Sequence, residues 1–511
     1  MSNSQNAALY FVDRHIEEGR ADKVAFREAD GRKRSLTYGQ LAEETGRFAG
    51  ALYRHGVRRE ERIAMIVRDQ IEFPVVFWGA LKAGAIPVPI NTLLSSAVYD
   101  TILTDSRASI LVVSEEQWPM VAPAIEGNRF LRAVLVIGEA PEGTESYTEF
   151  VDGAPVEETV EAHEDELAFW LYSSGSTGQP KGVRHVHSSL QATADTFGAQ
   201  VLGIREDDVV YSVAKIFFAY GLGNAMSFPM SVGATTILWS GRPTPEGAFQ
   251  VLENERPTIF CGVPTLYAAM NAAAEAEERK PDTDLRICTS AGEALPGEVG
   301  QKWQAMTGVE IVDGVGSTEM LHIFLSNRPG DIIYGTSGLP VPGYEVRLVD
   351  EHDEDVSAGE VGELLVRGPS AADGYWNRRS KSRATFEGMW TRTGDKYEQN
   401  EDGRFIYCGR TDDMFKVSGI WISPFEVEQA LITHPAVLEA AVVAHADDEG
   451  LEKPKAFVVL KEGQSPEDAG DLKDFVKQKI GLWKYPRWVD FVDDLPKTAT
   501  GKIQRFKLRD A

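Results

Sequence analysis

The chain has 511 residues, of which 43% are hydrophobic and 25% are charged. These proportions are ordinary for a globular protein and exclude a collagen-like fibre, a coiled coil and a largely disordered chain. The formal net charge is −26, and such an acidic surface repels phosphate backbones, so we expect binding neither to nucleic acid nor to an anionic membrane.

The cysteines and the apolar runs indicate the compartment. Cys261, Cys288 and Cys408 lie far apart and form no CxxC pair, which predicts a protein without a disulfide framework or a structural zinc site. Segment 1–19 lacks the apolar core of a secretory signal. No uncharged apolar run approaches the ~20 residues that cross a bilayer. We therefore expect a reduced, cytoplasmic protein.

Short apolar runs alternate with helical patterns over much of the chain. Strands are expected at 62–68, 85–90, 109–114, 133–137, 258–261, 285–289 and 309–312. Helices are expected at 70–83, 95–106, 264–279 and 297–306. Strand, helix and strand at this spacing predict parallel sheets with helices on their faces, and hence an α/β fold of doubly wound sheets.

Three stretches depart from this alternation. No Lys or Arg occurs between 133 and 180, and the acidic part at 139–166 is interpreted as a solvated loop or face. Beyond residue 330 strands dominate, at 344–349 and 363–367, which predicts a small β subdomain at about 330–411. The last part, with helices and strands, is expected to form a separate α+β domain. Its predicted elements are 424–432, 438–445, 455–460 and 472–480.

A strand-like run at 167–172 leads into a loop that is rich in glycine and hydroxyl groups. The loop reads Tyr172-Ser173-Ser174-Gly175-Ser176-Thr177-Gly178-Gln179-Pro180-Lys181-Gly182. Glycines permit positive φ and a close approach of the backbone, so successive N–H groups can form an anion-binding nest, to which the hydroxyls and Lys181 add donors. The spacing of a Walker A loop is missing. The loop is therefore predicted to cradle phosphates in another way, the alternative being a flexible surface loop.

This loop resembles the phosphate motif of the adenylate-forming superfamily of acyl- and aryl-CoA synthetases, luciferases and peptide-synthetase adenylation domains. Four further segments resemble motifs of that superfamily in the same order, so the resemblance covers almost the whole chain. It implies a large N-terminal domain at 1–411 and a small C-terminal domain at 412–511 that rotates about a hinge. It also implies ATP, Mg²⁺ and coenzyme A as reaction partners.

The second motif is Gly314-Val315-Gly316-Ser317-Thr318-Glu319, which follows a predicted strand. The resemblance implies that Thr318 contacts phosphate and that Glu319 holds Mg²⁺. One carboxylate is chemically sufficient, since Mg²⁺ otherwise prefers phosphate oxygens and water. A helix-start cap at Ser317 or Thr318 is the structural alternative, and the two roles are compatible.

The nucleoside is expected to lie between two further sets of residues. The resemblance implies that the segment 290–294 and the end of the strand before Glu319 sandwich the purine. The purine residues are Gly292, Glu293, Ala294, Asp313 and Gly314. It also implies that Asp395, in a Thr-Gly-Asp triplet, and Arg410 bind the ribose hydroxyls.

The remaining motifs lie towards the end of the chain. The resemblance implies that Asp412 is the hinge residue and that Lys502, in Pro496-Lys497-Thr498-Ala499-Thr500-Gly501-Lys502, is the catalytic lysine. It places Lys416, Ser418 and Gly419 near coenzyme A. Lys502 lies in a locally basic stretch of a very acidic protein, which suits a group that meets phosphates.

The acid-binding segment of the superfamily reads Phe217-Phe218-Ala219-Tyr220-Gly221 here. Members that activate amino acids carry Asp at the position of Phe218, and an apolar residue would leave a buried ammonium unpaired. An amino-acid substrate is therefore not expected. The predicted pocket is a small, flat, apolar slot. Its residues are Phe218, Ala219, Tyr220, Gly221, Gly314, His322 and Ile323, where His322 either packs at the rim or contacts the aryl acid.

Segments 316–344 and 416–426 are most similar to the benzoate–CoA ligases of the superfamily. The resemblance thus implies a ligase that forms benzoyl-adenylate from benzoate and ATP and passes the benzoyl group to coenzyme A. Three alternatives stay open: a CoA ligase for hydroxybenzoate, cinnamate, furoate or a short acyl acid, an aryl-AMP ligase that loads a carrier protein, and a non-enzymatic nucleotide-binding protein. A homodimer is compatible with the resemblance.

Overall fold

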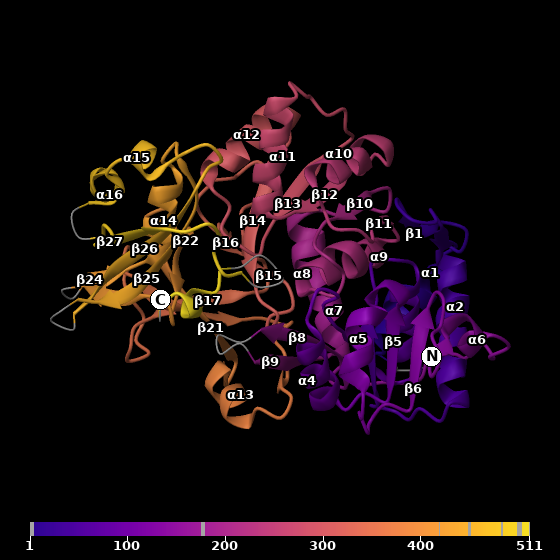
Figure 1. Cartoon of the computed structure of the whole chain (residues 1–511). Coiled ribbons are helices and arrows are strands. Elements are labelled where there is room, and N and C mark those ends of the chain that lie inside the picture. Colours follow the sequence, from indigo (N-terminus) through magenta and orange to yellow (C-terminus); the bar gives the residue numbers. More distant parts are fainter. Residues whose placement is uncertain are drawn as a thin grey trace. The chain divides into compact units, whose positions relative to one another are not determined.

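The computed structural model describes residues 5–174, 179–417, 420–447, 451–481, 484–497 and 503–509. By its contacts the chain divides into two compact units, whose elements are labelled in Figure 1. The first unit contains residues 1–346 and 366–391, and the second contains 347–365 and 392–511. The domain boundary that the sequence predicts at Asp412 stays a prediction.

The first parallel sheet confirms the beginning of the predicted alternation. Its order is β4-β3-β5-β6-β7, and all neighbouring strands run parallel. The strands are β3 (Arg62–Ile66), β4 (Ile86–Pro89), β5 (Ile110–Ser114), β6 (Ala133–Ile137) and β7 (Glu145–Ser146). The helices that follow them are α3 (Glu72–Lys82), α4 (Ser96–Ser106), η2 (Glu115–Gln117) with α5 (Trp118–Ile125), and α6 (Tyr147–Val151). Strands β4 and β5 are buried at every residue, which explains their unbroken apolar runs.

A nine-stranded sheet forms the rest of the first unit's framework, in the order β16-β15-β14-β13-β12-β10-β11-β1-β2. The strands from β14 to β1 are parallel, and β2, β15 and β16 add antiparallel edges. Its strands are β1 (Val24–Glu28), β2 (Ser35–Thr37), β10 (Val209–Ser212), β11 (Thr235–Leu238), β12 (Ile259–Gly262), β13 (Ile287–Ser290), β14 (Ile311–Gly316), β15 (Ile323–Ser326) and β16 (Leu339–Pro340).

The helices of the first unit include several that the sequence pattern did not reveal. Those predicted are α11 (Pro264–Ala276) and α12 (Gly297–Thr307). The others are η1 (Leu9–Asp13), α1 (Arg14–Glu17), α2 (Tyr38–Arg54), α7 (His187–Thr193), η3 (Ala194–Val201), α8 (Ala219–Leu222), η4 (Gly223–Ser227), α9 (Phe228–Val232) and α10 (Pro245–Asn254). The start of α2 does carry a sequence signal, because Thr37 and Gln40 form a capping box.

A short antiparallel sheet, β19-β9-β8, carries the predicted phosphate loop. Its strands are β8 (Leu167–Ser174), β9 (Pro180–Val186) and β19 (Gly374–Tyr375), which is followed by α13 (Arg379–Thr385) and β20 (Phe386–Glu387). The acidic stretch that precedes β8 has no regular structure from 152 to 163, and most of its acidic side chains are exposed. The interpretation as a solvated loop is therefore confirmed for this part.

The second unit begins with strands of the predicted β subdomain. The chain passes from one unit to the other three times, within β17 (Glu345–Val349), β18 (Gly362–Arg367) and β21 (Trp390–Gln399). Strand β22 (Phe405–Arg410) pairs with β21. The predicted α+β part is confirmed further on. It contains β23 (Phe415–Val417), β24 (Ile420–Ile422), α14 (Pro424–Ile432), β25 (Val437–Ala446), β26 (Glu452–Leu460), α15 (Pro466–Ala469), α16 (Leu472–Ile480), β27 (Trp488–Phe491) and η5 (Arg505–Lys507).

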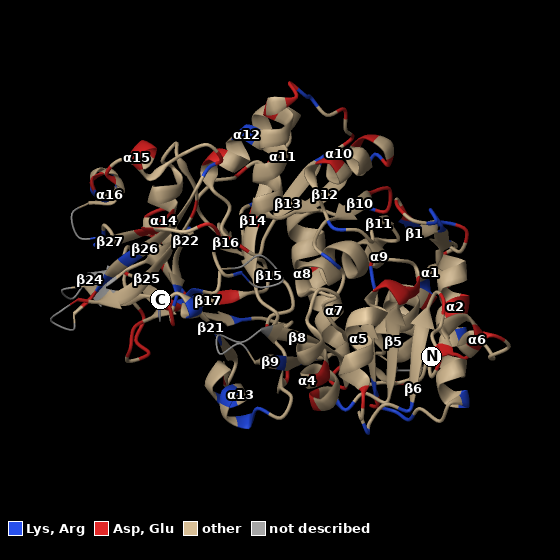
Figure 2. Cartoon of the chain, in the orientation of Figure 1, with Lys and Arg blue, Asp and Glu red and all other residues tan. Residues whose placement is uncertain are grey.

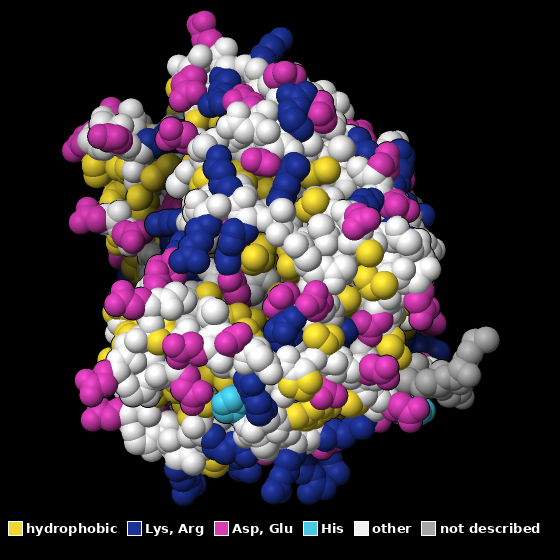
Figure 3. Space-filling model, turned by 90° about the vertical axis from the view of Figure 1, so that its right-hand side faces the viewer, with side chains coloured by type: hydrophobic (Ala, Val, Ile, Leu, Met, Phe, Trp, Pro, Cys, Tyr) yellow, Lys and Arg dark blue, Asp and Glu magenta, His cyan; other side chains and the backbone are white. Residues whose placement is uncertain are grey.

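The surface agrees with the composition. Figure 2 shows Asp and Glu on many elements of both units. On the face drawn in Figure 3, charged side chains of both signs are interspersed with small groups of apolar ones, as is usual for a water-exposed surface. Among the described residues, no helix is long and apolar enough to span a bilayer.

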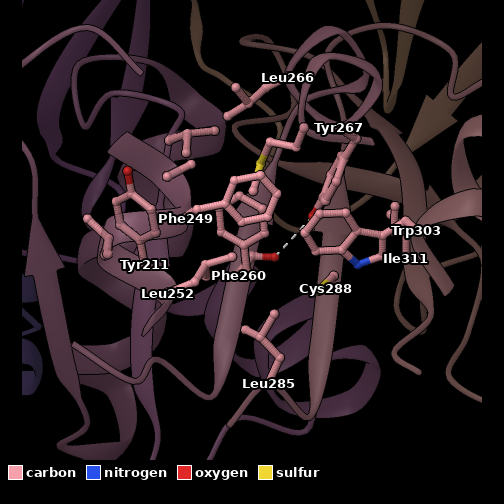
Figure 4. Packing of buried hydrophobic residues seen from close by; sticks show 14 of the residues in the cluster. Tyr211, Phe249, Leu252, Phe260, Leu266, Tyr267, Leu285, Cys288, Trp303 and Ile311 are labelled. Atoms are coloured by element: carbon pink, nitrogen blue, oxygen red, sulfur yellow. Dashed lines mark hydrogen bonds between the residues drawn. The ribbon is translucent and has the colours of Figure 1, made fainter. Parts of the chain in front are cut away.

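An aromatic cluster fixes the strands that carry the candidate site (Figure 4). Phe260 of β12 stacks on Trp303 of α12 with ring centroids 5.9 Å apart, and Tyr267 of α11 meets Trp303 edge-on at 4.8 Å. The Tyr267 hydroxyl donates to the Thr289 carbonyl at 2.9 Å, so the cluster also holds β13. All three rings are fully buried.

Truncating this cluster should destabilise the first unit. We expect Phe260→Ala to lower the free energy of unfolding by about 3–5 kcal/mol, because it removes a buried ring and leaves a cavity. Leu93→Ala is the matched control, since Leu93 is 62% exposed and should change stability by less than about 0.5 kcal/mol. Urea unfolding followed by tryptophan fluorescence measures both, and equal unfolding midpoints for the two variants would contradict the packing described.

Candidate active site

The phosphate loop is the connection of a β-hairpin. In the pairing of β8 with β9, Ser173 lies opposite Lys181 and Ser174 opposite Pro180, so the hairpin delivers both ends of the loop to one place. The Ser173 hydroxyl is buried and has no hydrogen-bond partner in the described part of the chain. The side chain of Ser174 and the whole of residues 175–178 lie outside the described residues. The predicted roles of Gly175, Ser176, Thr177 and Gly178 therefore stay predictions.

The structure brings Lys181 together with Glu319. The Lys181 Nζ lies 3.5 Å from Glu319 Oε1, and both side chains are mostly buried. Tyr375 completes the group, because its hydroxyl donates to the same carboxylate oxygen at 2.8 Å. Lys181 also lies 3.4 Å from that hydroxyl and 4.5 Å from the centroid of the Tyr375 ring. Two of these three residues were predicted from motifs far apart in the chain.

The motif that carries Glu319 is a turn between β14 and β15. The Ser317 hydroxyl accepts from Met320 N at 3.1 Å, but no helix follows, since the chain reverses and Leu321 has φ +64°. The helix start considered at this position is therefore wrong, because β15 pairs back on β14. His185 donates from Nε2 to the Thr318 carbonyl at 2.8 Å. Burial lowers the pKa of His185 to about 4, so the ring is neutral at pH 7.

The predicted purine segment lies where two parallel strands end side by side. Ser290 of β13 is the register partner of Asp313 in β14. Gly292 follows with φ +96°, and a Cβ there would meet nothing within 4 Å, so the space above it is open. The Ser290 hydroxyl and Asp313 Oδ1 are buried and close to each other, but neither makes a hydrogen bond of good geometry to a described residue. Unpartnered buried polar atoms of this kind suit a ligand that brings its own donors and acceptors.

Burial governs the protonation of Asp313. The side chain is 6% exposed, and burial raises the pKa of its carboxyl to about 8. The neutral acid is therefore the main form at pH 7, and it can both donate and accept a hydrogen bond. The other two predicted purine residues, Glu293 and Ala294, follow Gly292 in the chain and are partly buried.

The predicted acid-binding segment contacts the end of β13. The Tyr220 hydroxyl lies 2.5 Å from Thr289 Oγ1 of β13, and the Tyr220 carbonyl lies 3.3 Å from His322 Nε2. Gly221 is required here, because a Cβ would lie 2.0 Å from the Lys215 carbonyl oxygen. Phe218 and Ala219 begin α8 within the same tight turn. The structure thus places the segment 218–221 against β13 and the β14–β15 turn.

His322 is packed among aromatic rings. Its ring lies 5.1 Å from that of Phe197, 4.5 Å from that of Phe228 and 5.6 Å from that of Tyr220. Burial lowers its pKa to about 3, so the ring is neutral. These contacts support the packing interpretation. Because Nε2 donates to the Tyr220 carbonyl in a neutral ring, the Nδ1 atom, which has no partner in the described part of the chain, can only accept a hydrogen bond.

Ile323 and Gly314, which were predicted for the other side of the slot, pack against each other. Ile323 is buried in β15, and a Cβ on Gly314 would lie 2.8 Å from Ile323 Cγ2. A larger residue at 314 would therefore clash with the Ile323 side chain, and glycine avoids that clash. Both residues come from the strands that follow Asp313, so the predicted purine and acid sites share β14.

A buried ion pair that the sequence did not reveal supports the acid-binding segment. Asp69 Oδ1 accepts from Ile216 N at 3.3 Å, and Asp69 Oδ2 lies 3.8 Å from Lys215 Nζ. Burial raises the pKa of Asp69 to about 6. Asp69 thus joins the segment after β3 to the segment after β10, and its hydrogen bond with Ile216 spans 147 residues of sequence, a pairing that has no local pattern.

In the second unit, the predicted ribose residues form one group. Asp395 and Arg410 are register partners in β21 and β22, and Arg410 Nη1 donates to Asp395 Oδ1 at 2.9 Å. Arg410 also donates to the Thr393 carbonyl at 3.2 Å. The Asp395 side chain is 14% exposed. The two residues that the motifs implied for one ligand are thus adjacent.

The predicted hinge lies in an exposed turn. The Asp412 side chain is exposed, and its carbonyl accepts from Arg509 Nη2 at 2.6 Å. Lys416 belongs to β23, but its side chain lies outside the described residues. Ser418, Gly419 and Lys502 lie outside them as well.

Two family models match this arrangement. One, described as AMP-binding enzyme, matches residues 12–376, and another, described as AMP-binding enzyme C-terminal domain, matches residues 426–502. The chain belongs to the AMP-binding enzymes.

Similar proteins of this family are aryl-CoA ligases. The chain is 50% identical to a 4-hydroxybenzoate–CoA/benzoate–CoA ligase of Rhodopseudomonas palustris, over 99% of this chain and 94% of that protein. It is 52% identical to a benzoate–CoA ligase of Thauera aromatica, over 99% and 96%.

Solved structures lead to the same group. A benzoate CoA ligase from Burkholderia xenovorans LB400 is 50% identical over 99% of both chains, with a TM-score of 0.90. The anthranilate CoA ligase AuaEII, in complex with anthranoyl-AMP, is 42% identical over 100% of this chain and 98% of that chain, with a TM-score of 0.93. These likenesses bear out the α/β fold with a large N-terminal and a small C-terminal domain.

The residues of this AMP-binding enzyme fit Mg²⁺ only together with a nucleotide. Among the described residues, no group of three or more His, Cys, Asp or Glu side chains could hold a metal ion. Glu319 offers one mostly buried carboxylate beside Lys181 and the phosphate hairpin. Because Mg²⁺ accepts one or two carboxylates plus phosphate oxygens and water, this donor set suits a Mg²⁺–ATP complex.

We expect Asp313→Asn to stabilise the enzyme above neutral pH. Burial raises the folded pKa to about 8, whereas an unfolded Asp titrates near pH ~4. Between these two pKa values the folded wild-type protein keeps a proton that the unfolded chain releases. The free energy of unfolding of the wild type therefore falls as the pH rises from about 4 to about 8. Asn keeps the shape without the charge. The gain in melting temperature should therefore grow from about pH 5 to about pH 8.

Thermal melts of the two proteins across this range measure the effect. Asp22→Asn is the control, because Asp22 is an exposed Asp of the same unit and its substitution removes the same charge from the surface. A gain for Asp313→Asn that does not vary with pH would show that the carboxyl titrates normally.

Proposed function

We propose that this AMP-binding enzyme is an acid–thiol ligase that activates benzoate with ATP and transfers the benzoyl group to coenzyme A. The products are benzoyl-CoA, AMP and pyrophosphate. The observation that carries the proposal is the identity of 50% and 52%, over nearly the whole chain, with two relatives that are named for benzoate. The apolar segment 217–221, whose Tyr220 contacts His322, supports an aryl acid.

In the first half-reaction, a benzoate carboxylate oxygen bonds to the α-phosphorus of ATP, and the bond from that phosphorus to pyrophosphate breaks. The phosphate hairpin with Lys181, together with Thr318 and Lys502, would stabilise the charge that develops on the phosphates. Mg²⁺, when bound to Glu319 and the nucleotide, supplies further neutralisation of that charge. The purine would lie against Gly292, Glu293, Ala294, Asp313 and Gly314, and the ribose against Asp395 and Arg410.

In the second half-reaction, the coenzyme A thiolate attacks the acyl carbon, and AMP leaves. We propose that rotation of 412–511 about Asp412 removes Lys502 and brings Lys416, Ser418 and Gly419 to the pantetheine. Hinges of this kind are short loops that absorb φ and ψ changes, which suits the exposed turn at Asp412. We place the enzyme in the cytoplasm, where ATP and coenzyme A occur together, and its assembly as a homodimer stays a prediction.

A second candidate substrate is 4-hydroxybenzoate, because the Rhodopseudomonas palustris relative is named for both acids. Release of AMP from a panel of acids, measured with and without coenzyme A, tests both candidates. AMP release that requires coenzyme A identifies a CoA ligase, whereas stable acyl-adenylate without thioester would indicate transfer to a carrier protein. Absence of AMP with every acid would overturn the proposal.

The slot should select small, flat acids. We expect benzoate and fluorobenzoates to be good substrates, and cinnamate and bulky 4-substituted benzoates to be poor, because extra atoms in a filled apolar slot cost about 1–3 kcal/mol. Ile323→Ala should improve the larger acids relative to benzoate. The measurement is kcat/KM for each acid with both proteins. A wild-type preference for cinnamate over benzoate of about tenfold would refute the assignment of benzoate.

Lys502 should act only in the first half-reaction, the formation of benzoyl-adenylate. We expect Lys502→Ala to slow adenylation by about 10²–10³, because one preorganised charge at the transition state is lost. Thioester formation from synthetic benzoyl-adenylate should persist. Lys507→Ala is the control, since Lys507 is an exposed lysine of the same basic stretch. An equal loss in both half-reactions would refute the proposed rotation.

A further inference from the structure

Tyr375 lies between two charged groups of the proposed phosphate site. Its hydroxyl donates to Glu319 Oε1 at 2.8 Å, and Lys181 Nζ lies 3.4 Å from the same hydroxyl. The ring and hydroxyl are buried, with 4% of the residue exposed. None of the motifs described above contains this residue. It belongs to β19, a strand of two residues that pairs with β9.

The position of Tyr375 is fixed from several sides. Gly374 and Tyr375 pair with Arg184 and Val183 in β9, the strand that also contains Lys181. The Tyr375 N–H donates to Ser382 Oγ at 3.0 Å. Nearby, Ala372 N donates to the Glu319 carbonyl at 2.8 Å, so the segment 372–375 holds both the backbone and the side chain of Glu319.

The two contacts of Glu319 differ in what a nucleotide would do to them. Lys181 is a cation on a long, flexible chain, and a triphosphate carries more negative charge than one carboxylate, so the phosphates compete for it. The tyrosine hydroxyl is a neutral donor on a rigid ring and has no such reason to leave. If Lys181 turns to the phosphates, the Tyr375 hydroxyl remains to orient the carboxylate.

We propose that Tyr375 is a positioning residue that keeps the Glu319 carboxylate oriented for Mg²⁺–nucleotide binding while Lys181 exchanges Glu319 for the phosphates. This inference rests on the proposed function, since it assigns Glu319 and Lys181 to the ATP site. It concerns binding of the metal–nucleotide complex and leaves the aryl acid and the second half-reaction unaffected.

The test is Tyr375→Phe, which removes the hydroxyl and keeps the ring beneath Lys181. We expect KM for ATP to rise about tenfold, as for the loss of one hydrogen bond to a charged group, with KM for benzoate unchanged. Binding of Mn²⁺ in the presence of a non-hydrolysable ATP analogue, followed by electron paramagnetic resonance, should weaken by a similar factor. Thioester formation from synthetic benzoyl-adenylate should stay at the wild-type rate.

Tyr38→Phe is the matched control. Tyr38 is fully buried, and its hydroxyl donates one hydrogen bond of 2.8 Å to the Ala234 carbonyl, away from these residues. It should cause a similar loss of thermal stability, with Mn²⁺ affinity and KM for ATP within about twofold of wild type. The inference is overturned if Mn²⁺ affinity in Tyr375→Phe stays within this range, or if KM rises equally for ATP and benzoate. Wild-type protein that forms no AMP refutes the proposed function instead, and the Mn²⁺ titration still tests Tyr375.

Discussion

The parallel pairing of β13 with β14 is the constraint on which the candidate site depends. It places Ser290 beside Asp313, and the return of β14 into β15 then carries Glu319, His322 and Ile323. In open α/β sheets, ligands bind outside the carboxyl ends of parallel strands, where loops diverge. The aromatic cluster of Phe260, Tyr267 and Trp303 packs beside these strands, and Tyr267 donates to the Thr289 carbonyl, one residue before Ser290. The packed core therefore fixes the position of the strand end.

Burial sets the protonation of three polar groups in or beside the candidate site. In each of them desolvation outweighs the effect of neighbouring charges and hydrogen bonds, and it favours the neutral form: the pKa is about 8 for Asp313, about 3 for His322 and about 4 for His185. Lys181 and Glu319 keep 17% and 16% of their side chains exposed and lie beside each other as an ion pair. Neutral Asp313 and His322 thus lie in the regions proposed for the purine and the aryl acid, while the Lys181–Glu319 ion pair lies in the proposed phosphate site, where neutral His185 donates to the Thr318 carbonyl.

The candidate site was predictable wherever its residues lie in local motifs. The hairpin loop, the segment 314–319 and the segment 217–221 are each contiguous, because each must shape the backbone as well as supply side chains. Tyr375 and Asp69 were not predictable in this way. Each is a single residue whose partner lies 56 or 147 residues away, and a hydrogen bond over such a distance leaves no trace in composition or periodicity.

The sequence by itself determined the fold class, the family and the main strands and helices, since apolar periodicity and glycine-rich motifs are local properties of the chain. Strands β1, β2, β10 and β11 and the helix α2 were nevertheless not predicted. Only the tertiary structure decided that Ser317 begins a turn and not a helix, that His322 is buried and neutral, and that Tyr375 meets Glu319. The reason is physical: burial and long-range hydrogen bonds arise when distant segments pack, and no single segment contains them.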